Sequence, residues 1–351
     1  LIGYSDGISK KIVETALKNK KHVITANKAL IAKHGDYLSF LAEKKKVNLE
    51  FEAAVGGGIP ILRSIKDGLS TNKINKVVGI LNGTCNYILS EMESSQDSFS
   101  NVLKRAQQLG YAEPRNPKFD LNGYDTLDKV RILSALAFNK KISKNVCLMN
   151  GIEKIEFEDI EMANKLGFRI KLLGITEIIK GRLFERVHPC LIKKNKYIAN
   201  INGVMNAIIL NGKPVGESVF QGEGAGPGPT SSALMSDLLS ILRGNIKYPF
   251  GIPFTKRKVI NNYDKSLHSN SMYLRFDVKD KPGVLSSITK IFAKNKISIK
   301  NLIQKPNKKY KKASIIIITH KNLEKNYNNL LLNLYKNKFI LTKPTYIRIE
   351  K

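Results

Sequence analysis

Four ionisable side chains that lie close together in the sequence have the types and spacing that acid–base chemistry requires. Glu113, Asp120 and Asp125 precede Lys129, and apolar residues follow Lys129 at three, four and seven positions. These offsets fall on one face of an α-helix, so we expect Asp125 and Lys129 to point into the protein. Burial lowers the pKa of an amine toward the working range, and such a lysine can pass a proton to a substrate oxygen.

The same spacing also has a simpler interpretation. An aspartate and a lysine four residues apart are common on solvated helices, where the pair contributes only about 0.3–0.5 kcal/mol. Asp128, one position away from the apolar stripe, is expected to be a surface charge of this kind. The helix alone does not decide between a solvated pair and an amine in a cleft, so the surrounding elements and motifs must decide.

The elements around these residues predict an α/β region followed by an α+β region. The first seventy residues alternate apolar strands (22–25, 47–55) with amphipathic helices (8–17, 28–43), which is typical of a doubly wound parallel sheet. The opening strand with a G-x-G-x-x-G turn is missing, and the chain begins with Leu1 rather than Met. We therefore expect a partial Rossmann-like domain that is truncated at its N-terminus, and it stays open whether the chain by itself is active.

From residue 72 onward the pattern predicts a mixed domain, a linker and a small C-terminal module. The mixed domain is expected to contain strands at 74–81, 168–179, 183–192, 204–210 and 215–220 and helices at 84–92, 99–108, 123–138 and 230–242. A polar stretch at 256–271 indicates a linker. Beyond it the order βαββαβ predicts a ferredoxin-like module, with elements at 272–278, 283–295, 297–304, 313–319, 323–337 and 340–349.

Composition excludes several classes of protein. The 351 residues are 42% hydrophobic, and no apolar run approaches the ~20 residues that cross a bilayer, so we expect no membrane partner. The net charge of +30 suggests a nucleic-acid-binding protein, but only 11 of the 59 basic residues are Arg, and the lysines are spread along the chain. We therefore expect no nucleic-acid partner. The densest basic run, 305–312, is expected to be a hairpin loop.

Cysteine and histidine usage gives no metal motif. Cys85, Cys147 and Cys190 show no C-x-x-C spacing, which favours a reducing, cytoplasmic location over a disulfide framework. The five histidines form neither an H-E-x-x-H nor a Cys/His zinc pattern. We therefore do not expect a zinc enzyme.

Several long motifs, in order, resemble homoserine dehydrogenase. They are Thr25–Leu30 (TANKAL), Phe51–Pro60 (FEAAVGGGIP), Gly79–Leu89 (GILNGTCNYIL), Leu109–Lys129 and Gly222–Thr230. The C-terminal module, with Asp277–Leu285 (DVKDKPGVL), is similar to an ACT domain. The resemblance implies the bacterial single-function enzyme with a C-terminal regulatory domain.

The domains implied by this resemblance divide the chain into four parts. Residues 1–70 are the remainder of the nucleotide-binding domain, to which the helix near 230–243 returns, and residues 71–250 form the α+β catalytic and dimerisation domain. A linker follows at 251–271, and the ferredoxin-like ACT domain covers 272–351. A homo-oligomer, either dimer or tetramer, is expected.

The implied reaction is reversible, NAD(P)-dependent hydride transfer between aspartate semialdehyde and homoserine, a step toward threonine and methionine. Hydride that arrives at the aldehyde carbon builds negative charge on the oxygen, which must be protonated or held. The resemblance implies that Lys129 is the proton donor and Lys28 a second essential lysine beside the cofactor. Taken alone, Lys28 could be an ordinary lysine at the start of a helix, although it follows the carboxyl end of a strand, where ligands of α/β sheets bind.

The resemblance also implies substrate and cofactor contacts. Glu113, Asp120 and Asp125 match the acids that hold the amino-acid part of the substrate, whose ammonium favours facing carboxylates. The loop between Glu113 and Asp120 is one residue longer than usual, which makes the place of Asp120 less secure. Gly110 and Gly226 match backbone positions near the nicotinamide cofactor. Cys85 stands where the family usually has threonine. The absent N-terminal part would decide between NAD and NADP.

A monovalent cation, sodium by resemblance, is expected at the turn after Glu52. Its ligands would be Glu52 and the main-chain carbonyls of Val55, Gly57 and Ile59, because oxygen-only ligation suits a hard cation. The turn could equally be a glycine hinge between domains. At the ACT domain, threonine is the expected effector, although such modules also serve only for dimerisation. The alternative functions are an amino-acid sensor with a catalytically silent partner domain and a basic nucleic-acid-binding protein.

Overall fold

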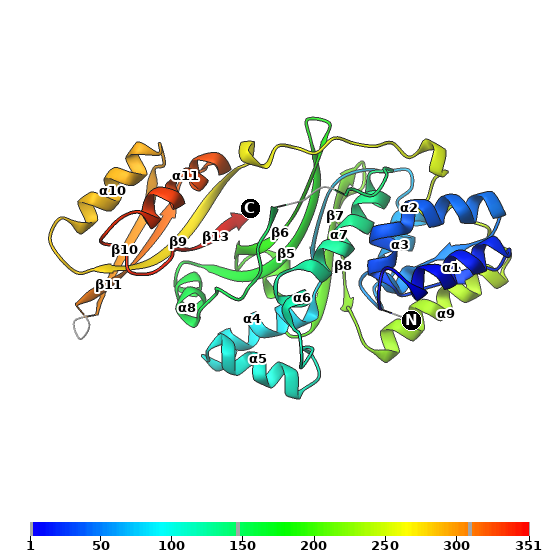
Figure 1. The fold of residues 1–351 in the computed structure, drawn as a ribbon, viewed down its shortest axis with the longest axis horizontal. Coiled ribbons are helices and arrows are strands. Elements are labelled where there is room, and N and C mark those ends of the chain that lie inside the picture. The colour runs from blue at the N-terminus through cyan, green and yellow to red at the C-terminus, as the bar shows by residue number, and fades with distance from the viewer. Residues whose placement is uncertain (1–2, 145–147, 308–310, 351) are drawn as a thin grey trace. The chain divides into compact units, whose positions relative to one another are not determined.

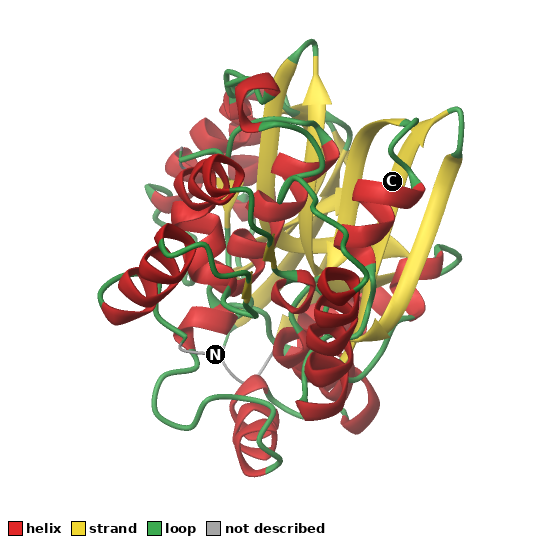
Figure 2. Cartoon of the chain, turned by 90° about the vertical axis from the view of Figure 1, so that its right-hand side faces the viewer, coloured by secondary structure: helices red, strands yellow, loops and turns green. Residues whose placement is uncertain are grey.

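The computed structural model describes residues 3–144, 148–307 and 311–350, and the chain divides into two compact units. The first unit comprises residues 1–151, 172–187 and 201–263, and the second comprises 152–171, 188–200 and 264–351. Helices and strands are distinguished in Figure 2, which shows the mixed α and β class that the sequence predicts. Cys147 lies outside the described residues. The predicted four-part division of the chain stays a prediction.

The N-terminal part of the first unit alternates strands and helices as predicted. Strands β1 and β2 pair in parallel, with Val23 opposite Leu49. The prediction of a strand through 47–55 is wrong, because the chain leaves the sheet after Glu50. The N–H of Glu52 donates to the side chain of Asp237 (3.0 Å) and the chain enters a 3₁₀ turn. The elements are α1 (Ile8–Lys18), β1 (Val23–Ile24), α2 (Lys28–Lys45), β2 (Leu49–Glu50), η1 (Glu52–Ala54), α3 (Ile61–Arg63) and the π-helical turn η2 (Ser64–Gly68).

The rest of the first unit is built on an antiparallel sheet that supports helix α7. Strand β3 lies between β5 and β7, and β7 also pairs with β8. The new elements are β3 (Lys73–Ile80), α4 (Gly83–Ser95), α5 (Phe99–Gln108), α6 (Lys118–Leu121), α7 (Tyr124–Ala137), β4 (Leu148–Met149), β5 (Phe168–Ile179), β6 (Arg182–Lys193), β7 (Met205–Lys213), β8 (Gly216–Glu223), α9 (Pro227–Leu242) and η4 (Phe254–Lys256). Strands β5 and β6 each have residues in both units.

Two close contacts fix the positions of helices α7 and α9 in this unit. A Cβ atom at Gly174 of β5 would lie 2.5 Å from Cγ2 of Val130, so the glycine allows α7 to pack directly on the sheet. Helix α9 contacts η1 and β1 and therefore lies beside the N-terminal elements (Figure 1). Arg63, after η1, forms an ion pair with Asp237 of α9 at 3.1 Å.

The second unit contains the predicted βαββαβ module. Its strands lie in the order β10-β11-β9-β13, and alternate residues of β9, from Met272 to Val278, pack against α10 and α11. The opposite face of β9 carries Arg275, whose Nε lies 2.6 Å from Oδ1 of Asp159 on α8. The elements are α8 (Phe157–Lys165), η3 (Tyr197–Asn200), η5 (Lys265–Leu267), β9 (Ser269–Lys279), α10 (Val284–Lys294), β10 (Ile299–Asn307), β11 (Lys312–Thr319), β12 (Asn322–Leu323), α11 (Glu324–Tyr335) and β13 (Thr345–Glu350).

The basic run at 305–312 is only partly a loop. Strand β10 continues to Asn307 and β11 begins at Lys312, so the two strands of the hairpin include both ends of the run. Within the described residues, no helix combines the length and the apolar character that crossing a bilayer requires.

Candidate active site

Helix α7 holds a buried ion pair on the face predicted from the sequence. Gly123 precedes the helix with φ of 86°, a left-handed conformation that glycine adopts without strain. In the first turn of the helix, the carboxylate of Asp125 accepts a hydrogen bond from Nζ of Lys129 at 2.8 Å, and Nζ also donates to the main-chain oxygen of Leu81 at 2.6 Å. Both side chains are at most 10% exposed. The interpretation as a solvated surface pair is therefore wrong.

A second lysine reaches the same carboxylate from the start of α2. Asn27 caps this helix by accepting a hydrogen bond from the N–H of Leu30, and Lys28 is the first helical residue. Nζ of Lys28 lies 3.0 Å from Oδ1 of Asp125. Each oxygen of Asp125 thus faces a different ammonium group, so the carboxylate bridges two lysines that are 101 positions apart in the sequence.

Asn82 connects this ion pair to a second carboxylate. Its Nδ2 donates to Oδ1 of Asp120 at 2.8 Å and to Oδ2 of Asp125 at 2.9 Å. Its Oδ1 accepts from the N–H of Cys85 at 2.8 Å and so caps helix α4. The buried amide uses both of its donor hydrogens and one acceptor, and it holds the two acids at fixed positions.

The charges in this cluster shift the pKa values of its acids in opposite directions. For Asp125, burial alone would raise the pKa, but Lys129 and Lys28 outweigh it and hold the pKa well below its ordinary value. For Asp120, burial and then the charge of Asp125 raise the pKa. For Lys28, burial alone would lower the pKa, but the acids outweigh it and the pKa is raised, which maintains the ammonium form.

A cleft of about 670 Å³ opens over the cluster. Its wall includes main-chain atoms of two glycine turns, one at Gly110 with φ of 75° and one at Gly226 with φ of 117°. A side chain at Gly110 would meet no other atom within 4 Å, so this wall is open toward the cleft. The predicted residues that line the cleft are Lys28, Gly110, Asp120, Asp125, Lys129 and Gly226.

Glu113 and Asp128 do not lie where the sequence suggested. Glu113 is exposed and is not among the residues that line the cleft. The helix α5 that precedes it ends at Gln108, and Nε2 of Gln107 donates to the main-chain oxygens of Glu113 (3.4 Å) and Pro114 (3.2 Å). Asp128, expected to be a surface charge, is half-buried, and burial raises its pKa to about 6.

The predicted cation ligands lie in the turn that follows β2. The carboxylate of Glu52 is buried and accepts hydrogen bonds from the N–H groups of Leu62 (2.8 Å) and Arg63 (2.9 Å). Burial raises the pKa of this carboxyl to about 7. The turn packs tightly against the Gly226 wall of the cleft, because a Cβ atom at Gly57 would lie 2.7 Å from the carbonyl group of Gly224.

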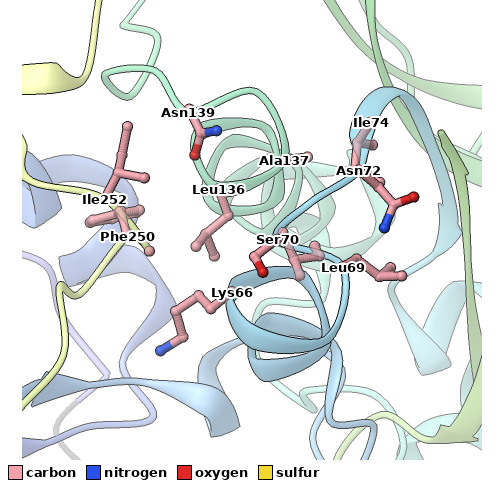
Figure 3. Close-up of a pocket in the computed structure, with 12 residues that line it drawn as sticks. Lys66, Leu69, Ser70, Asn72, Ile74, Leu136, Ala137, Asn139, Phe250 and Ile252 are labelled. Atoms are coloured by element: carbon pink, nitrogen blue, oxygen red, sulfur yellow. The ribbon is translucent and has the colours of Figure 1, made fainter. Parts of the chain in front are cut away.

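A second cavity in this unit is too small for a substrate. It measures about 50 Å³, which is room for one or two water molecules. Lys66, Asn72 and Phe250 are among the residues that line it (Figure 3), and Nζ of Lys66 is bound by Glu50 at 2.9 Å. The larger cleft is therefore the candidate active site.

Two site residues were not singled out from the sequence. Asn82 stood within a recognised motif, but nothing in its type or spacing indicated that its amide would join Asp120 to Asp125. Thr84 also lines the cleft, and its hydroxyl donates to the main-chain oxygen of Tyr111. An asparagine immediately before a helix is a capping signal, and it could have drawn attention to Asn82.

Comparison with known proteins gives consistent matches. The family model for homoserine dehydrogenase matches residues 60–239, and the ACT domain model matches residues 272–332. The homoserine dehydrogenase of Neisseria gonorrhoeae is 41% identical to this chain, and the alignment covers 98% of this chain and 80% of the relative. The homoserine dehydrogenase of Helicobacter pylori is 42% identical, and the alignment covers 97% of this chain and 79% of the relative. The crystal structure of a homoserine dehydrogenase from Thiobacillus denitrificans superposes on this chain with a TM-score of 0.91 and 39% sequence identity. The superposition covers 98% of this chain and 80% of the chain in the crystal structure.

Proposed function

Because the chain belongs to the homoserine dehydrogenase family and carries an ACT domain, we propose specific roles for the residues of its cleft in the family's reaction. The enzyme is an oxidoreductase that interconverts homoserine and aspartate semialdehyde with a nicotinamide cofactor. Lys129 is the proton donor to the aldehyde oxygen and accepts the proton back in the oxidative direction. The observation that carries this assignment is the bridging of Lys129 and Lys28 by Asp125 inside the cleft.

The hydrogen-bonding capacity of Lys129 supports this role. Its ammonium has three donors, and Asp125 and Leu81 accept two of them. The remaining donor is available to a substrate oxygen, and the two fixed partners orient it before the substrate arrives. A positioned donor of this kind contributes about 10²–10⁴-fold to the rate.

The acids of the cleft suit a substrate that carries an ammonium group. We assign the binding of this group to Asp120 and Asp125, whose positions are fixed by Asn82. Glu113 is assigned the same role by motif. It lies in an exposed loop, so contact with the substrate requires this loop to move toward the cleft.

The glycine-lined wall of the cleft suits a nicotinamide cofactor. Gly110 and Gly226 present backbone without side chains, and Lys28 lies beside them on the same cleft. When bound, the nicotinamide ring supplies or accepts the hydride. Lys28 would then provide positive charge beside both the cofactor and the substrate.

A monovalent cation, sodium in particular, is proposed at the turn after Glu52. The donor set is entirely oxygen, from Glu52 and the carbonyls of Val55, Gly57 and Ile59, which suits a hard cation. Both carboxylate oxygens of Glu52 already accept a main-chain N–H, so a cation there would use remaining lone pairs. A buried carboxylate also gains from a compensating positive charge.

Regulation and assembly are proposed from the ACT module. Its turn at 280–283 ends where α10 begins, and main-chain N–H groups at such a turn can hold a small carboxylate. We assign threonine as the effector there, which calorimetry with threonine and with other amino acids tests. A dimer or tetramer is proposed as well, and light scattering on the purified protein measures it. A cytoplasmic location stays a prediction.

The decisive experiment replaces Lys129 by alanine in the protein expressed from its complete coding sequence. We expect homoserine-dependent reduction of NAD⁺ or NADP⁺ to fall by about 10²–10⁴-fold, because the proton acceptor of the oxidative direction is removed. Lys104→Ala, on the exposed side of α5, is the matched control and should keep the wild-type rate. A Lys129→Ala enzyme with wild-type turnover would remove the proposed mechanism.

A further inference from the structure

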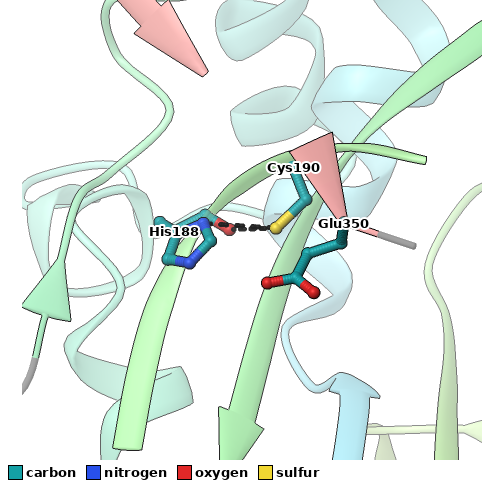
Figure 4. Close-up of side chains that lie close together, drawn as sticks. All are labelled: His188, Cys190 and Glu350. Atoms are coloured by element: carbon teal, nitrogen blue, oxygen red, sulfur yellow. Dashed lines mark hydrogen bonds between the residues drawn. The ribbon is translucent and has the colours of Figure 1, made fainter. Parts of the chain in front are cut away.

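Three side chains with metal-binding donors meet in the second unit. His188 and Cys190 are two positions apart on β6, so they project from the same face of that strand. Strand β13 pairs with β6 in parallel, with Arg348 opposite Cys190 and Glu350 opposite Ile192. A ring nitrogen of His188, Sγ of Cys190 and a carboxylate oxygen of Glu350 all lie within 4.8 Å of one another (Figure 4).

We propose that these three residues bind a divalent transition metal of the zinc class, with water as a fourth ligand. A set of one nitrogen, one sulfur and one oxygen donor suits zinc, whereas magnesium and calcium prefer oxygen alone. No sequence motif indicates this site, because a His-x-Cys pair and a glutamate 160 positions later match no recognised pattern.

One of the donor distances is close to that of an occupied site. Bond lengths of about 2.0–2.3 Å put neighbouring donors of a tetrahedral zinc site roughly 3.5 Å apart. Sγ of Cys190 already lies 3.2 Å from Nδ1 of His188. Glu350 is half-buried on the last strand of the module, and one of its carboxylate oxygens lies within 4.8 Å of the other two donors.

The charges around the three residues also allow a cation. A thiolate and a carboxylate together neutralise a divalent ion, and the thiol proton passes to solvent when the metal binds. Arg186, two positions before His188 on β6, is paired with Glu177. The positive side chain of β13, Arg348, donates from Nε to Oε2 of Glu324 at 3.2 Å. Glu324 therefore compensates the charge that would otherwise oppose the metal.

A metal at this position would tie two strands of the unit together. Strand β13 is hydrogen-bonded to β9 along one edge and to β6 along the other. Because the ligands come from both β6 and β13, the metal would bind the folded unit better than the unfolded chain and so stabilise it.

The test measures zinc and cobalt binding to the full chain after removal of metals with a chelator. We expect one Zn²⁺ per chain, a rise in the melting temperature that the chelator reverses, and a thiolate-to-cobalt charge-transfer band with Co²⁺. Cys190→Ser should abolish the band, whereas Cys85→Ser and Cys147→Ser should keep it. Because Cys190 is buried, Glu350→Gln provides a second substitution at a half-buried position. It should weaken zinc binding at least 10-fold, with its melting temperature in zinc compared with that of its own metal-free form.

The opposing result is equally clear. If the wild-type chain shows no charge-transfer band, or if Cys190→Ser binds zinc as tightly as wild type, the three residues are only a thiol–imidazole hydrogen bond with a neighbouring carboxylate. Unchanged zinc affinity in Glu350→Gln would likewise overturn the proposed ligand set.

Discussion

The ammonium nitrogen of Lys129 lies 2.8 Å from Oδ2 of Asp125, one turn earlier on the same helix. The other oxygen of Asp125 faces Lys28, at the start of a different helix. A single buried carboxylate therefore sets the positions of both lysines in the cleft. Loss of its charge would leave two ammonium groups facing each other with no anion between them.

Asp125→Asn tests this arrangement. We expect kcat/KM for homoserine to fall at least about 100-fold, because removing one partner of a buried ion pair costs about 3–5 kcal/mol. Steady-state kinetics measures the fall in kcat/KM, and the melting temperature measures the loss of stability. Asp128→Asn, on the same helix but outside the cleft lining, is the control and should keep most of the activity. If both variants lose the same kcat/KM, the activity depends on the integrity of helix α7 and not on the carboxylate that bridges the two lysines.

Asn82→Ala tests the link between the two acids. The substitution removes a cap worth about 1 kcal/mol and also removes the shared donor of Asp120 and Asp125. Hydrogen bonds to charged groups contribute about 1.5–3 kcal/mol, so we expect kcat/KM to fall by about 10–100-fold. Ser98→Ala, which removes the cap of α5, separates the two effects: it should cost similar stability and leave kcat/KM unchanged. If both variants behave alike, Asn82 is a helix cap only.

Gly174→Ala tests whether the packing of α7 on the sheet positions the site. Its new Cβ would lie 2.5 Å from Val130 and 2.9 Å from Thr126, which are the neighbours of Lys129 and Asp125 on the helix. We expect a loss of about 1–3 kcal/mol from overpacking, with a fall in kcat. Gly68→Ala, where the new atom meets nothing within 4 Å, should change neither quantity. Wild-type kcat in a destabilised Gly174→Ala enzyme would show that the site tolerates a shift of α7.

Local pattern predicted much of this fold, and its failures have physical causes. Strand β5 was predicted at its observed bounds, and the apolar stripe of α7 correctly indicated that Lys129 is buried. The strand predicted through 47–55 ends early because the main-chain N–H of Glu52 donates to the carboxylate of Asp237, a partner 185 positions away that no local pattern reveals. Helix α8 was missed, and its Asp159 is held by Arg275 of β9, again a distant partner.

The candidate site was predictable only in part for the same reason. Motif resemblance indicated Lys28, Asp120, Asp125 and Lys129, and all of them line one cleft. It did not indicate Asn82, because the role of this amide depends on two carboxylates that approach it from separate helices. Nor did it indicate that Glu113 is exposed, because the loop that carries it has no periodic pattern to fix its orientation.

Glu52 predicts a pH dependence of stability. Burial raises its pKa from 4.5 to about 7 in the folded protein, so the folded state keeps the proton after the unfolded chain has lost it. Stability from this group is therefore full below about pH 4.5, falls as the pH rises toward 7 and is constant above it. The change corresponds to at most about 3 kcal/mol. Glu52→Gln, which does not titrate, should lose this slope when unfolding is measured from pH 5 to pH 8.

The same measurement examines the proposed cation. A sodium ion beside Glu52 favours the charged carboxylate and lowers its pKa, so the slope between pH 5 and pH 7 should shrink in sodium chloride compared with choline chloride at equal ionic strength. Glu52→Gln places an N–H₂ against a main-chain N–H and will lower stability at every pH. This loss of stability is the same at every pH, whereas the change of stability with pH arises only from ionisation of Glu52. Equal slopes in the two salts would argue against sodium at this turn, and equal slopes in the two proteins would mean that Glu52 is ionised throughout.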